Sequence, residues 1–182
     1  LLVHAASGGV GSFLVQWARA AGGNVIALAG SDEKAAGALK NGARHAFNSR
    51  QDGWVQKVRD ATGGRGVDVV YDGIGQATFE RSLDCLRPRG LMVSFGNASG
   101  PVTGVSLSML QSRGSLYVTR PTTAHYYGTR NDLRRTMARV FGAVLAGDIR
   151  PSINQRFPLD RVQDAHRALE ARETTGTTLL IP

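Results

Sequence analysis

Glycines near the start of the chain have the spacing of a phosphate-binding turn. The run from Val3 to Gly11 reads VHAASGGVG, with Gly8 and Gly11 at the second and third glycine positions of the dinucleotide fingerprint and Ala6 at the first. Glycine at the second position lets the backbone approach a pyrophosphate, and glycine at the third permits close helix–strand packing. N–H groups at the start of the helix, with the positive end of its dipole, would then bind the phosphates.

The context of this turn decides its meaning, because an ordinary strand–helix turn can have the same glycines. An apolar run, Leu1–Ala5, precedes the turn as a buried strand would. A helical pattern over Gly9–Ala21 follows it, and a second apolar run, Asn24–Leu28, comes next. Strand, glycines, helix and strand thus follow in the order that the fingerprint requires, and the turn is predicted to bind a dinucleotide.

The tip of the second strand favours NADP over NAD. An NAD site usually has Asp or Glu there, whereas this chain reads Leu28-Ala29-Gly30-Ser31. Ser31 and Lys34, at the start of the next helix, offer a hydroxyl and an ammonium to a 2′-phosphate, each charge-assisted bond contributing roughly 1.5–3 kcal/mol. Asp32 and Glu33 would repel that phosphate unless they point away from it, and their other role is to cap the helix.

The elements that must position these residues alternate between strands and helices, as in βαβ units. The fold class predicted is therefore α/β, a Rossmann doubly wound parallel sheet of about six strands with helices on both faces. The expected strands are Leu1–Ala5, Asn24–Leu28, Arg44–Phe47, Val67–Asp72, Gly90–Phe95 and Ser115–Thr119. The expected helices are Gly9–Ala21, Ser31–Lys40, Trp54–Ala61, Ala77–Leu86 and Asp132–Ala146.

The pattern changes at Asp148, which divides the chain into residues 1–147 and 148–182. In the second part Ile149–Phe157 is expected to be extended, Leu159–Ala171 helical, and Thr177–Ile181 a final strand. This strand-helix-strand appendage is separate from the six-stranded unit. Because the first residues already belong to a strand, we expect the sequence to be a fragment of a longer enzyme.

Composition narrows the class of protein further. A single cysteine, Cys85, can build neither a disulfide framework nor a cysteine-rich metal cluster, which fits the reducing cytoplasm. No stretch approaches the ~18 apolar residues of a membrane helix. The net charge of +8 comes from 19 arginines and three lysines, which are scattered without interleaved aromatic residues. We therefore expect a solvated arginine-rich surface and no nucleic-acid partner, although a polyanionic cofactor would benefit from this field.

Several longer runs resemble the quinone oxidoreductase branch of the zinc-independent medium-chain dehydrogenases/reductases, over nearly the whole chain. These runs are His4–Gly11, Val69–Gly75, Ser82–Leu86, Arg89–Gly100, Gly114–Pro121 and Leu179–Pro182. The resemblance implies an enzyme that reduces quinones or related electron-poor acceptors with NADPH. It also implies a preceding GroES-like domain, on which the segment 148–182 would pack.

The resemblance assigns cofactor-binding roles by position. The pyrophosphate would contact the glycine turn, the 2′-phosphate would contact the next helix start, and a late arginine would reach back to the cofactor. Residues after the fourth and fifth strands would line the nicotinamide ribose and ring. In that order the residues are Ser7, Gly8, Gly9, Val10 and Gly11; Ser31 and Lys34; Arg172; and Asp72, Gly73, Phe95, Gly96 and Asn97.

Some of these positions have a second interpretation. Asp72 either orients a ribose or caps the loop after its strand. Where some members have a tyrosine beside the adenosine, this chain has Asn48-Ser49-Arg50, and Arg50 either substitutes by stacking or charge or is a solvated loop residue. His4 and Cys85 are expected in the core. The four histidines lack metal-ligand spacing, so no metal site is predicted.

No catalytic residue is nominated, because the nicotinamide supplies the hydride and the protein holds donor and acceptor together. The strand Ser115–Thr119 would leave an unpaired sheet edge, and family members pair it in a homodimer. We expect the same here. Two alternatives remain: an enoyl or alkenal reductase of the same superfamily, and a non-enzymatic NADPH-sensing or RNA-binding protein.

Overall fold

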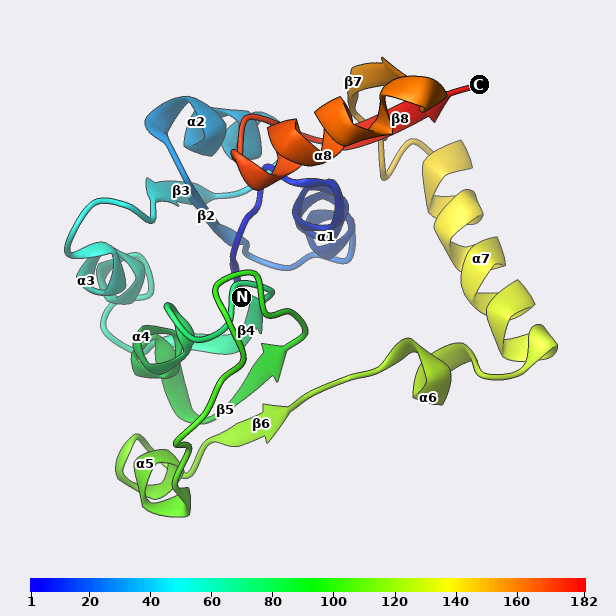
Figure 1. Ribbon diagram of the computed structural model, residues 1–182. Helices are drawn as coiled ribbons and strands as arrows, with labels where there is room; N and C mark the ends of the chain where they lie inside the picture. The colour runs from blue at the N-terminus through cyan, green and yellow to red at the C-terminus, as the bar shows by residue number, and fades with distance from the viewer.

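The computed structural model describes residues 1–182 as a six-stranded sheet with a separate two-stranded sheet (Figure 1). The six strands lie in the order β3-β2-β1-β4-β5-β6, and every neighbouring pair is parallel. Their bounds are β1 Leu2–Val3, β2 Ile26–Ala29, β3 His45–Asn48, β4 Val67–Asp72, β5 Leu86–Ser94 and β6 Tyr117–Thr119. This order reverses direction between β1 and β4, as in a Rossmann fold, so the predicted doubly wound sheet is confirmed.

Helices cover both faces of the sheet. Because side chains alternate along a strand, Leu2 packs on one face of β1 and Val3 on the other. The face of Leu2 is covered by α3 and α4, which contribute Trp54 and Leu83 to a cluster of 13 buried residues. The opposite face is covered by α1 and α2 with a smaller cluster of seven. The bounds are α1 Gly9–Ala20, α2 Asp32–Lys40, α3 Trp54–Asp60 and α4 Phe79–Asp84.

After β6 the chain leaves the six-stranded sheet and returns to the side of the molecule where α1 and α2 lie (Figure 1). Helix α7 lies away from the sheet, whereas β7, α8 and β8 lie beside α1 and α2. Strands β7 and β8 pair in parallel as the predicted strand-helix-strand unit. The bounds are α5 Leu107–Ser112, α6 Thr123–Tyr127, α7 Arg130–Leu145, β7 Ile153–Pro158, α8 Val162–Glu170 and β8 Thr177–Ile181, with a 3₁₀ turn at Leu159–Arg161.

Several predicted boundaries differ from the observed ones, and one of them differs for a clear reason. The helix expected over Ala77–Leu86 ends at Asp84, and Leu86 instead opens β5 by pairing with Val67. The Val67 N–H donates to the Cys85 carbonyl at 2.8 Å, and Pro88 has no N–H with which a helix could continue. Helices α5 and α6 were not predicted from the sequence, because each is too short to show a helical period.

A buried polar network joins β1 to β4 beneath the carboxyl edge of the sheet. The Ser82 hydroxyl donates to the Asp72 carboxylate at 2.9 Å and lies 2.8 Å from His4 Nε2. A hydroxyl has one proton, so the His4 ring nitrogen is the donor to Ser82. His4, Asp72 and Ser82 are all buried, and Thr78 adds a further hydroxyl to Asp72 at 2.7 Å. The expectation that His4 lies in the core is confirmed, and its ring is hydrogen-bonded there.

This network predicts acid sensitivity of the fold. Burial lowers the pKa of His4 below its ordinary value of 6.5, although the Asp72 carboxylate opposes that shift. The unfolded chain therefore takes up a proton near pH 6.5 that the native chain does not, and stability falls as the pH falls below that value. We expect the urea midpoint to drop between pH 7.5 and 5.5, and to drop less in His4→Asn, whose side chain does not titrate. Equal drops in the two proteins would contradict this assignment.

Candidate functional site

The glycine turn joins β1 to α1 at the carboxyl edge of the sheet. The Gly8 N–H donates to the Ala5 carbonyl at 2.9 Å, and Gly8 is the N-cap of α1 with an extended backbone. A Cβ on Gly11 would overlap the Ala5 carbonyl oxygen and lie 2.8 Å from the Ala6 Cα. The start of α1 is thus pressed against the end of β1, as expected for the third glycine of the fingerprint.

The N-terminus of α1 has the chemistry of an anion site. Its first intrahelical bond runs from the Ser12 N–H to the Gly8 carbonyl, so the N–H groups of Gly9, Val10 and Gly11 have no acceptor within the helix. No side chain caps this end, and its first turn contains no acidic residue. The N–H groups of this first turn and the positive end of the helix dipole therefore stabilise negative charge placed at this end of α1.

The N-terminus of α2 differs, because its own residues satisfy it. Ser31 accepts from the Lys34 N–H at 3.2 Å, which confirms the predicted cap. The Asp32 carboxylate accepts from Asn48 Nδ2 at 3.1 Å and from Gln51 Nε2 at 3.2 Å. These bonds hold the Asp32 carboxylate towards the loop after β3.

Lys34 reaches the C-terminal part of the chain. Its ammonium donates to the backbone carbonyls of Arg172 at 2.5 Å and Thr174 at 3.2 Å. Arg172 has a left-handed backbone with a φ of 60°. The structure therefore brings together two predicted site residues that are 138 positions apart in the sequence.

The segment before β8 lies directly over the glycine turn, a contact that sequence reasoning missed. The Gly176 N–H donates to the Ser7 carbonyl at 2.8 Å, and Gly176 forms a β-bridge with Gly8. A Cβ on Gly9 would lie 3.3 Å from the Gly176 carbonyl oxygen. The glycine at position 176 was the one signal available in the sequence, and a glycine indicates a turn without naming its partner. In the structure its φ is 58°.

The loops after β4 and β5 meet beside the turn. The Phe95 N–H donates to the Asp72 carbonyl at 2.9 Å, and a Cβ on Gly96 would lie 2.8 Å from the Gly73 Cα. The Asp72 carboxylate accepts from the N–H groups of Ile74 and Gly75 at 2.7 and 3.2 Å. With Thr78 and Ser82 also bonded to it, this carboxylate makes the contacts of the loop-capping alternative.

One residue at this edge was not singled out from the sequence. The guanidinium of Arg120, after β6, donates to the Gly96 carbonyl at 3.0 Å and to the Ser94 hydroxyl at 3.3 Å. It fixes the loop that follows β5. The Arg120-Pro121 pair marked only the end of a strand in the sequence, so nothing in the pattern indicated this contact.

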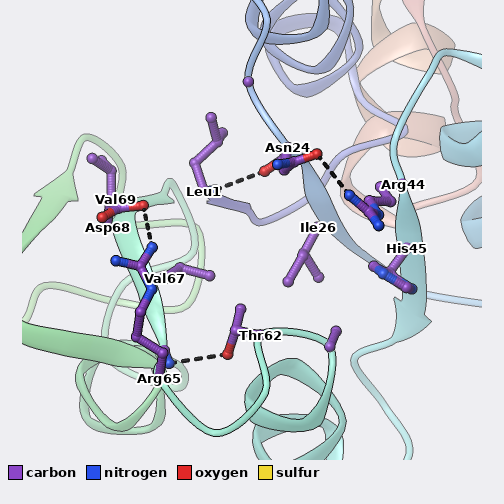
Figure 2. Close-up of a pocket in the computed structure, with 13 residues that line it drawn as sticks. Leu1, Asn24, Ile26, Arg44, His45, Thr62, Arg65, Val67, Asp68 and Val69 are labelled. Carbon is purple, nitrogen blue, oxygen red and sulfur yellow. Dashed lines mark hydrogen bonds and ion pairs between the residues drawn. The ribbon is translucent and has the colours of Figure 1, made fainter.

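A hollow of about 440 Å³ lies at the opposite edge of the sheet, where the strands begin (Figure 2). The chain at the starts of β1, β2 and β4 lines this hollow together with Arg44, Arg65 and Asp68. Asp68 is paired with Arg65 at 2.9 Å and with Arg87 at 2.5 Å, so its charge is already compensated. None of the predicted site residues lines this hollow, and the candidate site remains the carboxyl edge.

Metal-ligating groups do not gather in this chain. No three His, Cys, Asp or Glu side chains lie close enough to hold a metal ion.

Cys85 is buried in the core as expected, and burial raises the pKa of its thiol to about 12. No helix is both long and apolar enough to span a membrane.

Comparison with known proteins identifies relatives. The model of a family described as zinc-binding dehydrogenase matches residues 9–143. The chain is 49% identical to quinone oxidoreductase 1 of Escherichia coli, covering all of this chain and 56% of that protein. It is 42% identical to 2-haloacrylate reductase of a Burkholderia species, covering 55% of that protein. The crystal structure of E. coli quinone oxidoreductase complexed with NADPH superposes with a TM-score of 0.95 over all of this chain and 56% of that one.

These matches confirm the resemblance to the quinone oxidoreductase branch. The chain spans about half the length of the relatives it matches. The family description names zinc, but the donor groups of this chain do not fit a zinc site, since no cluster of three ligands exists and the one cysteine is buried.

The contact at Gly11 predicts a sharp difference between two glycines. Gly11→Ala should destabilise the fold by roughly 1–3 kcal/mol, because its Cβ would overlap the Ala5 carbonyl and the turn must open. Gly37→Ala in α2 is the matched control, since its Cβ would have no neighbour within 4 Å, and it should gain about 0.5–1 kcal/mol. Urea unfolding of both variants measures the difference. A neutral Gly11→Ala would overturn the close-packing role.

Proposed function

This chain belongs to the zinc-binding dehydrogenase family, and we propose that it is the cofactor-binding part of an NADPH-dependent quinone oxidoreductase. The observation that carries this proposal is the uncapped start of α1, where the N–H groups of Gly9, Val10 and Gly11 face the carboxyl edge of the sheet. The similarity to a quinone oxidoreductase crystallised with NADPH supports the choice of cofactor.

The residues present fit the phosphates of NADPH. Ser7, Gly8 and Gly9 would hold the pyrophosphate at the α1 N-terminus, since none of these positions has a bulky side chain that would keep a phosphate from the backbone. Ser31, Lys34 and Arg172 would hold the 2′-phosphate. The absence of an acid at the tip of β2 and the engagement of Asp32 with Asn48 and Gln51 support this assignment.

The nicotinamide end would lie against the loops after β4 and β5. Gly73, Phe95, Gly96 and Asn97 would line the ribose and ring, while Asp72 holds the first loop in shape through its hydrogen bonds. Bound NADPH supplies the hydride for the acceptor. The chain's own contribution is to fix the cofactor and to exclude water around it, so that the nicotinamide and the acceptor lie at reacting distance. No side chain is assigned as acid or base.

The substrate site would be completed by a preceding domain. We divide the chain into a cofactor-binding unit, 1–147, and a segment, 148–182, that packs on that domain. Exposed apolar side chains in the second part support this division: Ile153, Leu159, Leu169, Leu180 and Ile181 are 38–59% exposed. We place the enzyme in the cytoplasm, where a free buried thiol such as Cys85 is usual.

A second candidate reaction is the reduction of an electron-poor alkene. The 42% identity to 2-haloacrylate reductase favours this reaction, because the alignment with that relative covers the whole of this chain. Parallel assays of the longer protein with a quinone and with 2-chloroacrylate, each with NADPH, would separate the two activities.

Lys34 should decide between the two dinucleotides. Lys34→Ala removes the ammonium next to the proposed 2′-phosphate site, so NADPH affinity should fall about 10-fold or more while NADH affinity changes little. Lys40→Ala, on the exposed last turn of the same helix, is the control and should leave both affinities unchanged. Nicotinamide fluorescence titrations measure these constants. Equal wild-type affinity for the two dinucleotides would refute the NADP preference.

The edge strand β6 should mediate a homodimer. Tyr117 is 61% exposed and Val118 is 39% exposed, and the outer side of β6 has no partner in the sheet. We expect a dimer mass by sedimentation, reduced to a monomer mass by Tyr117→Lys, because an edge lysine opposes strand pairing. Tyr126→Lys, equally exposed on α6, should leave the dimer intact. A wild-type monomer at all concentrations would reject this interface.

A further inference from the structure

The loop after β3 is fixed against the end of β2 by short-range bonds. Both the N–H and the hydroxyl of Ser49 donate to the Ala29 carbonyl, at 2.8 and 3.1 Å. The Arg50 N–H donates to the Asn48 side-chain oxygen at 3.0 Å, which sets the direction of the chain at that residue. Arg50 therefore has a defined position beside the tip of β2.

The side chain of Arg50 lies next to Gly30. Its Nε is 3.8 Å from the point where a Cβ on Gly30 would stand, and no other atom comes within 4 Å of that point. Gly30 belongs to the stretch where an NAD-binding chain has an acidic residue. In this chain that stretch therefore has the Arg50 guanidinium beside it and contains no carboxylate.

The positive charge of Arg50 has no acidic partner in the structure. Asp32 and Asp52 are the acids near this loop. The Asp32 carboxylate is occupied by the amides of Asn48 and Gln51, on either side of Arg50 in sequence, and Asp52 forms no ion pair. None of the ion pairs in the chain includes Arg50, Lys34 or Arg172. Arg50, beside Gly30, and Lys34, in the first turn of the helix that Ser31 caps, are thus cations without a carboxylate partner.

We propose that Arg50 is a specificity-determining residue whose guanidinium binds the 2′-phosphate of NADPH together with Lys34. This inference rests on the proposed function and deepens it. A planar guanidinium donates two parallel N–H groups to phosphate oxygens, a geometry that ammonium cannot reproduce. The amides of Asn48 and Gln51 contribute indirectly, because by holding Asp32 they keep the guanidinium available for the phosphate.

The competing role for Arg50 is stacking on the adenine ring, which NADPH and NADH share. The two roles differ in what a substitution does. Loss of a phosphate contact weakens NADPH alone, whereas loss of a stacking surface weakens both dinucleotides alike. Comparison of the two ligands therefore separates the alternatives without any assay of turnover.

The experiment is a fluorescence titration of the longer protein that contains this chain, and of its Arg50→Gln variant, with NADPH and NADH. We expect Arg50→Gln to weaken NADPH binding by about 10-fold to 100-fold and to leave NADH within about twofold. Arg50→Lys, which keeps the charge but not the fork, should recover part of the loss. Arg44→Gln is the matched control, since this exposed arginine bonds to Asn24 at the opposite edge of the sheet.

The outcomes distinguish this inference from the proposed function. A wild-type chain that binds neither dinucleotide, or both equally, rejects the proposed cofactor and with it this role. A wild-type preference for NADPH that survives in Arg50→Gln rejects the role of Arg50 alone. An equal loss for both dinucleotides assigns Arg50 to stacking and also rejects the phosphate contact. Thermal unfolding of each variant checks that a loss of binding is not a loss of fold.

Discussion

The arrangement of the candidate site depends on the contact between the start of α1 and the end of β1. Because Gly11 has no Cβ, the helix begins directly against the Ala5 carbonyl. This brings the unpaired N–H groups of the first turn to the carboxyl edge of the sheet, where parallel strands leave a crevice at the reversal between β1 and β4. A larger residue at position 11 would tilt or shift the helix and move every donor away from that crevice.

The strands on both sides of this reversal are tied together below the crevice. His4 on the β1 side and Asp72 on the β4 side are linked through the Ser82 hydroxyl of α4. Buried polar groups are costly unless they are hydrogen-bonded, and here each member has a partner. The network therefore specifies how the end of β4 sits relative to the end of β1. It also leaves the Asp72 carboxylate fully engaged, which makes it a support for the loop rather than a group awaiting a ligand.

The sequence predicted what depends on local pattern. The glycine turn, the Ser31 cap and the alternation of strands and helices each follow from short-range physical rules, and the structure contains them. Boundaries failed where tertiary pairing decides them, as at Leu86, which joins β5 because Val67 is its neighbour. The contact of Gly176 with Ser7 and the bond from Lys34 to Arg172 were beyond sequence reasoning, since nothing local relates residues so far apart.

These long-range contacts connect the cofactor site to the C-terminal segment. The Lys34 ammonium donates to the carbonyls of Arg172 and Thr174, and the same segment then bonds to Ser7 through Gly176. A phosphate at Lys34 would compete with these carbonyls for ammonium protons or share them, because an ammonium has three donors and two are in use. The proposed 2′-phosphate site and the position of the segment 148–182 are therefore not independent. Since that segment is also the one proposed to pack on a preceding domain, a cofactor bound at Lys34 would act on the domain contact through two backbone carbonyls.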